Sequence, residues 1–526
     1  MAANKKLPGN NKNFGATPPA QVSRSTFNLS KNWKGTFDAG QLIPFFVSEG
    51  LPGDTRKIRV SAICRMATPI KPLFDNIYLD FHFWWVPCRQ LWDNFTKMMG
   101  EQENPGDTID YLAPQLSINS TGGEGKTLAD NMGLIPPESI QVELGYFVAS
   151  MPFRAYARIY NYHYRDQNLI DSVVQDTDDG PDTLSDYPVR RRGKRHDYLT
   201  ASLPFQQKGD PVSIDLGGSA PIFTDVEAGF VGIGLGENAT QWRTLDPAPV
   251  SLSHTTGTNG SATMFADLGS ATGISITELR QSIAMQHVLE RDARSGSRYP
   301  EILLSRFRVM DPQMLVLQRP EYLGGGTKSI TITPVPQTTP TDIVPDVSPQ
   351  GNLAATGTAM VDGIGFTRSF TEHGYIMGIV SARADLTYQQ GVERMWNRRA
   401  RFDWFHPELA HLSEQAVLQK EIYVTGNVEQ DDATWGFIGA YDDYRYGQSL
   451  ITGKFRSSDP DSLEIWHASQ YFANSPTLNQ TFIEENPPID RLVATPDEPQ
   501  FLMDAFISDI AARPIPISGI PGLSRI

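Results

Sequence analysis

Residues 77–92, IYLDFHFWWVPCRQLW, constrain the fold more than any other stretch of the chain, because they alternate with the period of two that is typical of a β-strand. One face carries Leu79, Phe81, Phe83 and Trp85, and the other carries Tyr78, Asp80, His82 and Trp84. The first face is wholly apolar and needs a second layer to cover it. The second combines apolar bodies with polar edges, which is typical of surfaces that meet a partner. We therefore predict a core strand of a large β structure and expect Trp84 at a subunit interface.

Further strands are predicted near both ends of the chain, with helices between them. Period-two patterns predict strands at 57–70, 372–388 and 501–514, and a short β-branched run predicts one at 421–425. Helical spacing predicts helices at 91–100, 151–167 and 275–295. The strands are far apart in sequence and must pair with each other. This pattern favours a mainly β protein, a sandwich or jelly roll with elaborate connections.

The helix predicted at 275–295 has the clearest signals. Ser275 and Glu278 form a capping box, and Ile276, Leu279 and Ile283 form the stripe expected to face inward. The helix predicted at 151–167 has an aromatic stripe made of Phe153, Tyr156, Ala157, Tyr160 and Tyr164.

The charge of the chain is unevenly distributed. Its formal net charge is −15, which argues against a protein that coats nucleic acid over its whole surface. Residues 1–37 nevertheless contain no Asp or Glu, and their basic residues are Lys5, Lys6, Lys12, Arg24, Lys31 and Lys34. Such a basic arm either binds an anionic partner on the inner side of an assembly or is disordered. The sequence leaves both interpretations open.

Composition favours a globular protein with many loops, since the chain contains 44 Gly and 38 Pro residues. Two cysteines are too few for a disulfide framework and indicate a reducing compartment. We expect neither a signal peptide nor a membrane span. Residues 203–272 are rich in Gly, Ser, Thr and Ala and predict an insertion with weak β structure, whereas the Pro/Thr-rich residues 330–360 predict a surface loop.

No motif indicates catalysis or a cofactor. GGEGKT (122–127) lacks the first Gly of a phosphate-binding loop, and the glycines of 232–239 lack an acidic ribose partner. DTDDGPD (176–182) lacks the bidentate Glu of a calcium loop and predicts a solvated acidic turn. His406 and His411 do not have the spacing of metal ligands. We therefore expect a protein that is not an enzyme and has no cofactor or metal.

Two basic segments remain as candidate contact sites. The first contains Arg190, Arg191, Arg192, Lys194 and Arg195. It is either a DNA-facing strip, since guanidinium forks match phosphate geometry, or a surface strip balanced by the preceding acids. The second contains Arg394, Trp396, Arg398, Arg399, Arg401 and Trp404. Interleaved Arg and Trp suit single-stranded nucleic acid and also a subunit interface, and we favour the interface.

Several stretches resemble the major capsid proteins of microviruses, particularly the gokushovirus branch. They include FDAG (37–40), LPGDT (51–55), MATPI (66–70), DFHFWWVPCRQLW (80–92), RRRGKRHDYLTASLPFQQKG (190–209), ERDARSGSRYPE (290–301), QRPEYLGGG (318–326), HPELAHLSEQAVLQKEIY (406–423) and RYGQSLITGKFRSS (445–458). The resemblance covers most of the chain in the expected order. It thins out at 210–270 and 330–360.

The resemblance implies a fold and a function. The fold would be a single eight-stranded antiparallel jelly roll over 38–526, with long loop and helix insertions. The protein would assemble with itself into a T=1 icosahedral shell around circular single-stranded DNA of a bacteriophage. It would be made in the bacterial cytoplasm and reside in the virion. The further partners would be a small basic DNA-packaging protein, a pilot protein and a host surface receptor, the last met by a three-fold protrusion for which 203–272 is the candidate.

Two other classes of protein compete with a coat protein. A β-sandwich that binds or hydrolyses carbohydrate could use Trp84, Trp85, Trp396 and Trp404 as sugar platforms. A hydrolase would also need two carboxylates at a defined separation, and no such pair stands in a recognisable motif. A receptor-binding spike would show fibrous repeats, which the sequence lacks.

Overall fold

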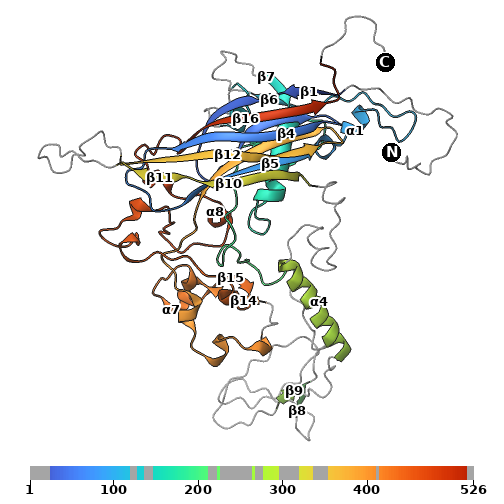
Figure 1. Ribbon diagram of the computed structural model, residues 1–526. Coiled ribbons are helices and arrows are strands. Elements are labelled where there is room, and N and C mark those ends of the chain that lie inside the picture. Colours follow the sequence, from blue (N-terminus) through green and yellow to red (C-terminus); the bar gives the residue numbers. More distant parts are fainter. Residues whose placement is uncertain are drawn as a thin grey trace, which may run out of the picture. The chain divides into compact units, whose positions relative to one another are not determined.

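The computed structural model describes residues 24–118, 127–135, 146–210, 222–224, 264–266, 276–294, 319–335, 354–409 and 414–517. The chain divides into two compact units. One comprises Gln206–Gly296, and the other comprises the residues before and after it. The larger unit holds the two main sheets (Figure 1).

The first main sheet has six antiparallel strands among the described residues. They are β1 (Ser25–Asn28), β2 (Lys31–Phe37), β4 (Thr55–Met66), β11 (Thr331–Pro334), β12 (Ala355–Ser369) and β16 (Phe501–Arg513). The order is β1, β16, β4, β12, β11, and β2 also pairs with β16. β1 pairs with 510–513 and β2 with 501–507, so the first two strands of the described residues share the last described strand, β16, as their partner.

The second main sheet has four antiparallel strands in the order β10, β5, β13, β3. They are β3 (Ile43–Gly50), β5 (Ile77–Pro87), β10 (Glu321–Ser329) and β13 (Gly374–Ala384). The inward side chains of both sheets form one buried cluster that contains, among others, Val60, Phe81, Phe83 and Ile507. This apolar cluster is the main core, and its burial is the principal stabilising contribution to the fold.

Four of the predicted strands that bring this core together are confirmed. Residues 57–70 lie in or just after β4, and 77–92 contain β5, which ends at Pro87. Residues 372–388 contain β13, and 501–514 contain β16. The apolar face predicted for β5 is buried, with Leu79, Phe81, Phe83 and Trp85 between 0 and 4% exposed. A mainly β, antiparallel architecture is therefore confirmed.

The strand predicted at 421–425 is wrong. A 3₁₀ turn, Gln419–Glu421, stands at its start, and the nearby strand is β14 (Glu414–Leu418), which pairs with β15 (Thr434–Gly439). Glu421 explains the difference, because its buried carboxylate accepts hydrogen bonds from the Leu418 amide and the Tyr198 hydroxyl. Those bonds bend the backbone into a turn that the β-branched residues alone did not indicate.

Helix α3 (Met151–Ile159) continues into a π-helical turn, η4 (Tyr160–Tyr164), and confirms the helix predicted at 151–167. Its aromatic stripe is buried in a second cluster that also contains Trp84, Met377 and Ile379 from β5 and β13. These residues cover the outer face of the four-stranded sheet. Of the helix predicted at 91–100, only α1 (Phe95–Met98) forms, after a 3₁₀ turn at Cys88–Gln90.

Helix α4 (Ile276–Arg294) confirms the position of the third predicted helix but not the burial of its stripe. Leu279 is 41% exposed and Ile283 is 48% exposed, so the inward orientation is wrong within the described chain. Ser275, the predicted cap, lies outside the described residues. In the same unit, β8 (Ile222–Thr224) pairs with β9 (Met264–Ala266), as the weak β structure predicted for 203–272 requires.

The predicted arm and loop differ from the structure at their edges. Residues 25–37 belong largely to β1 and β2, so this part of the arm is sheet, while Lys5, Lys6 and Lys12 lie outside the described residues. Similarly, β11 and the start of β12 occupy both ends of 330–360 and pair as a hairpin. In the arm and in the loop, the strands form where polar and apolar residues alternate at the end of an otherwise polar segment.

The remaining elements are short. They are α2 (Leu128–Asn131), β6 (Gln115–Ile118), β7 (Tyr146–Ala149), α7 (Val428–Asp431), α8 (Gln480–Ile483) and the 3₁₀ turns Leu184–Asp186, Arg394–Asn397, Arg401–Asp403, Pro407–Leu409, Asp442–Tyr444, Gly453–Phe455, Glu464–Trp466 and Ile489–Arg491. Cys64 and Cys88 are both free and buried, and burial raises the pKa of each thiol to about 12.

Candidate functional site

The polar face of β5, which the sequence placed at a subunit interface, is covered within the chain. Trp84 is 6% exposed and stacks on His163 of η4, with 4.0 Å between the ring centroids. Its Nε1 donates to the Tyr164 hydroxyl at 3.2 Å, and that hydroxyl lies 2.8 Å from Nδ1 of His82. This packing corrects the expectation for Trp84, since the partner of this face is η4 of the same chain.

Asp80, on the same face, is buried and its carboxylate accepts hydrogen bonds from two arginines and one threonine. Arg192 Nη1 donates to its Oδ2 at 2.6 Å and Arg383 Nε at 2.9 Å, while the Thr327 hydroxyl donates to Oδ1 at 2.6 Å. Burial alone would raise the pKa of Asp80, but the Thr327 hydroxyl and the two guanidinium groups together lower it. The carboxylate therefore stays charged and holds β5, β10, β13 and the 190–195 segment together.

The 190–195 segment is anchored to the protein rather than freely exposed. Arg191 Nη1 donates to the Ala39 carbonyl oxygen at 2.8 Å and to Oδ1 of Asn486 at 2.9 Å. Lys194 is 6% exposed, and its Nζ donates to Oε1 of Gln470 at 2.7 Å and to the Phe482 carbonyl oxygen. Burial lowers the pKa of Lys194 to about 8.

These partners divide the predicted DNA-facing residues into two groups. Lys194 has almost no surface left for a phosphate, and Arg191 and Arg192 are engaged with protein acceptors, which corrects the expectation of a continuous strip. Arg195 is exposed and Arg190 is partly exposed, so DNA contact stays a prediction for these two.

The 394–404 segment presents aromatic side chains to solvent. Trp396 is 73% exposed, Phe402 is 67% exposed and Trp404 is 48% exposed. Two arginines fix the segment from beneath: Arg394 Nη1 donates to Glu421 Oε1 at 2.9 Å, and Arg398 pairs with Asp443. The remaining two, Arg399 and Arg401, are exposed.

Large aromatic rings held outward by a fixed backbone are typical of contact surfaces between proteins. The described structure thus offers the 394–404 segment as a candidate interface and leaves its subunit contact as a prediction.

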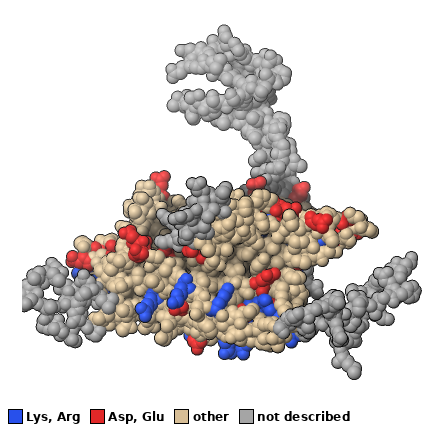
Figure 2. Space-filling view, turned by 90° about the horizontal axis from the view of Figure 1, so that it is seen from above, with Lys and Arg blue, Asp and Glu red and all other residues tan. Residues whose placement is uncertain are grey.

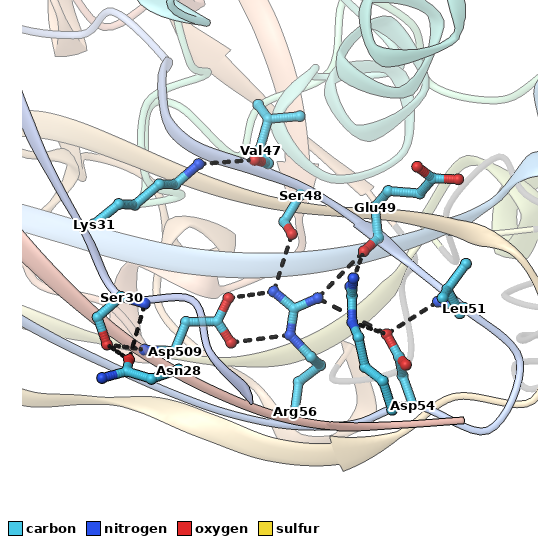
Figure 3. A network of polar contacts seen from close by, with 11 residues as sticks. Asn28, Ser30, Lys31, Val47, Ser48, Glu49, Leu51, Asp54, Arg56 and Asp509 are labelled. Carbon is cyan, nitrogen blue, oxygen red and sulfur yellow. Dashed lines mark hydrogen bonds and ion pairs between the residues drawn. The ribbon is translucent and has the colours of Figure 1, made fainter. Parts of the chain in front are cut away.

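Sequence inspection missed a buried polar network around Arg56 (Figure 3). Arg56 is fully buried, and its Nε donates to Oδ1 of Asp509 at 2.9 Å while Nη2 pairs with the second carboxylate oxygen. The same guanidinium donates to the Glu49 carbonyl oxygen at 3.2 Å and to the Ser48 hydroxyl at 2.9 Å. Neighbouring Asp54 accepts from the Leu51 amide, and Arg513 Nε lies 3.1 Å from it.

This network joins the two sheets, because Arg56 lies on β4, Asp509 on β16 and Ser48 on β3. The sequence did contain a signal for it. Arg56 and Asp509 occupy inward positions of their alternating strands, where apolar residues are otherwise found. Two opposite charges at such positions are buried at a tolerable cost only if they meet.

The acidic turn at 176–182 is not simply solvated. Asp182 is 7% exposed and accepts a hydrogen bond at 2.8 Å from Nε of Arg154, which is itself buried in α3. Asp178 supplies a second carboxylate, 3.3 Å from Arg154 Nη2. The turn therefore acts as the counter-charge for a buried arginine, which corrects the sequence interpretation.

The described residues show neither a metal site nor a membrane-spanning helix. In the part of the chain that the structure covers, no group of three or more His, Cys, Asp or Glu side chains is arranged to hold a metal ion. Likewise, none of the described helices has the length and apolar character needed to cross a membrane.

Comparison with known proteins identifies the family. The family model described as "Capsid protein (F protein)" matches residues 16–523. The chain belongs to this family of phage capsid proteins. It is 42% identical to "Capsid protein VP1" of Bdellovibrio phage phiMH2K over 97% of this chain and 98% of that protein. The proteins of the same description from Chlamydia phage 1 and Spiroplasma virus 4 are 36% and 35% identical and cover at least 96% of both chains.

Family membership confirms several expectations. The relatives are structural capsid proteins of microvirus-type bacteriophages and not enzymes, so the chain is a capsid protein of the virion. The carbohydrate alternative loses its support. Two of its four candidate sugar platforms, Trp84 and Trp85, are buried inside the protein.

Proposed function

We propose that this chain is the major capsid protein that assembles into a T=1 icosahedral shell around the circular single-stranded DNA of a bacteriophage. The observation that carries the proposal is the match to the capsid family over almost the whole chain. Relatives from three phages extend over nearly their full length, so no large part of the chain is left for a different activity.

Strand order supports the finer proposal of an eight-stranded jelly roll. Without the short β1 and β11, the sheets read β2, β16, β4, β12 and β10, β5, β13, β3. Along the chain, β2, β3, β4 and β5 alternate between the sheets, and β10, β12, β13 and β16 alternate again. Two such sets of four strands wrapped around one core are what a jelly roll requires.

For subunit contacts, we propose the exposed segment 394–404. Its rings lie outward, and its backbone is held by ion pairs to Glu421 and Asp443. A contact surface that is already ordered in the free chain loses little conformational entropy on assembly.

For the host receptor, we propose the insertion 203–272 as a three-fold protrusion. Its support is that Gln206–Gly296 forms a compact unit of its own. Further partners in this proposal are a small basic packaging protein and a pilot protein, both met in the bacterial cytoplasm where the chain would be made. An acidic chain with a net charge of −15 cannot by itself neutralise a packaged genome, which is the reason to expect the basic partner.

Purified particles from infected cells test the proposal. We expect this chain as the dominant protein, closed shells of sixty copies by cryo-electron microscopy, and circular single-stranded DNA that survives nuclease until the shell is opened. Recovery of the chain only as a folded monomer, or only as a minor virion component, would contradict it.

A further inference from the structure

The outer face of the six-stranded sheet is exposed in the described chain and carries unpaired positive charge. Along β4, Lys57, Arg59, Ser61, Ile63 and Arg65 alternate outward with fully or nearly buried residues. Alternate residues of a strand lie about 6.6 Å apart, so the three cations extend over roughly 26 Å of the sheet. Figure 2 shows a row of Lys and Arg side chains crossing the visible surface, with few acidic side chains among them.

These three cations have no partner within the described ranges, since Lys57, Arg59 and Arg65 make no ion pair or side-chain hydrogen bond there. Opposite charges on neighbouring strands are the usual partners in a sheet. Here the cross-strand neighbours are Thr367 and Ile510 for Lys57, Gly365 and Ser508 for Arg59, and Thr358 and Leu502 for Arg65. None of these six residues is charged.

Two carboxylates on the same face already have partners on neighbouring strands. Asp504 lies 3.4 Å from Lys34 Nζ, and Asp362 accepts a hydrogen bond from the Ser61 hydroxyl at 2.9 Å. The buried Arg56, one position away on β4, has the carboxylate of Asp509 as its partner. The chain as a whole has a net charge of −15, yet this face carries three cations without a partner in the described residues. Such a face is expected to attract an anion from another molecule.

The surface also has a groove and an exposed aromatic ring. A groove of about 600 Å³ crosses β2, β16 and β4. Its lining includes Lys34, Arg65, Ile63 and Leu502, together with the carboxylates of Asp130 and Asp504. Phe506 is 49% exposed on the neighbouring outward position of β16. Guanidinium groups that meet phosphates and an aromatic ring on which a base can stack are the two components of single-strand binding.

We infer that this face, defined by Lys57, Arg59, Arg65 and Phe506, binds the backbone and bases of single-stranded DNA. The inference rests on the proposed function, which supplies the DNA. The basic N-terminal segment joins this same sheet at β1. Because it carries positive charge like the face, it is not the anion that the face needs, and both can bind the same polyanion. A second copy of the same sheet face is also a poor partner, because it would place cations against cations.

Neutralisation of the two arginines tests the inference. The variant Arg59→Gln/Arg65→Gln is compared with the charge-keeping Arg59→Lys/Arg65→Lys, and with Lys97→Gln/Lys454→Gln, which removes two basic charges from other parts of the chain. Binding of the purified chain to a fluorescent thirty-nucleotide oligothymidylate is measured between 50 and 300 mM NaCl. Each lost phosphate contact lowers the slope of log K against log salt by about 0.7, so we expect a loss of about 1.4 in the Gln variant only.

Particles made with the same variants give the second readout. We expect closed shells with less nuclease-protected DNA in the Gln variant, and normal content in the Lys and control variants. If the wild type forms closed shells and the Gln variant keeps the wild-type slope and DNA content, the inference is overturned. The proposed capsid function is then unaffected. Loss of shells with an unchanged slope identifies the face as a subunit contact and overturns it too. Absence of closed shells from the wild type contradicts the proposed function itself.

Discussion

Arg56 and Asp509 meet as a buried, two-pronged ion pair although 453 residues separate them along the chain. One belongs to the fourth strand and the other to the last, and the pair also reaches β3 through Ser48. The contact therefore joins β4 and β16 of one sheet to β3 of the other at a single point.

Removing one partner of this pair should destabilise the chain strongly. Asp509→Ala leaves the buried Arg56 guanidinium with only its longer contact to Asp54, 3.9 Å from Nη1, as a counter-charge. We therefore expect a loss of about 3 kcal/mol in the free energy of unfolding measured in urea, at the lower end of the cost of breaking a buried ion pair. The double variant Arg56→Met/Asp509→Leu should lose less, because both desolvation penalties disappear. The exposed pair Lys34–Asp504 is the control, and its removal should cost under about 1 kcal/mol. Equal losses for the buried and exposed pairs would refute this account.

Neighbouring arginines at 192 and 195 should behave differently. Arg192→Gln removes a charged hydrogen bond to the buried Asp80, so we expect a loss of about 1.5–3 kcal/mol in the free energy of unfolding. Arg195 is exposed, and Arg195→Gln should leave thermal unfolding unchanged. Indistinguishable melting temperatures for the two variants would show that the Asp80 cluster is not structural.

His82 should make the protein less stable in mild acid. Burial lowers the pKa of His82 from 6.5 to about 4, so between these pH values the unfolded chain takes up a proton that the folded chain does not. Stability is therefore lost as pH falls through this window, by at most about 3 kcal/mol. Unfolding in urea at pH 7 and pH 5 measures it, and the difference should shrink in His82→Gln. The exposed His287→Gln is the control and should keep the wild-type difference.

The exposed rings of the 394–404 segment should matter for assembly and not for folding. Trp396→Ser/Trp404→Ser is expected to reduce the yield of closed particles at least tenfold while the melting temperature of the unassembled chain stays within 2 °C. Leu112, which is 88% exposed, provides the matched control Leu112→Ser, with normal particle yield expected. A normal particle yield from the tryptophan variant would remove the segment from the subunit interface.

Shortening the insertion should separate attachment from assembly. Removal of 225–262 is expected to leave shells intact by electron microscopy and to lower adsorption to host cells by at least tenfold. Failure of the shells to form would show that the insertion is part of the shell, and unimpaired adsorption would assign receptor binding elsewhere.

Alternation in the sequence predicted the strands that carry the core. β4, β5, β13 and β16 each have long runs of period two, and a pleated strand turns such a run directly into one buried and one exposed face. The same regularity contained the Arg56–Asp509 pair, since both residues interrupt the apolar parity. The sequence alone does not predict this pair, because the two charged residues can be matched only when β4 and β16 are known to be adjacent.

The burial and the contact partners of individual side chains were harder to predict from the sequence. The sequence places Trp84 at a subunit interface and Lys194 on a DNA-facing strip, yet each is covered by a segment distant in sequence. That segment is η4 for Trp84 and the region around Gln470 and Phe482 for Lys194. A basic cluster such as 190–195 gives no indication whether its charges meet a carboxylate, a carbonyl or solvent. Only the tertiary arrangement distinguishes these cases.

The position of β16 between β2 and β4 has a consequence for synthesis on the ribosome. β1 and β2 cannot join the sheet until 501–513 have emerged, because β16 separates them from β4 and is the last of the described strands to be made. A polypeptide that stops before Phe501 thus lacks the strand that joins β1 and β2 to β4, and we expect it not to form a native-like subunit. The topology therefore favours copies whose translation has passed the end of β16.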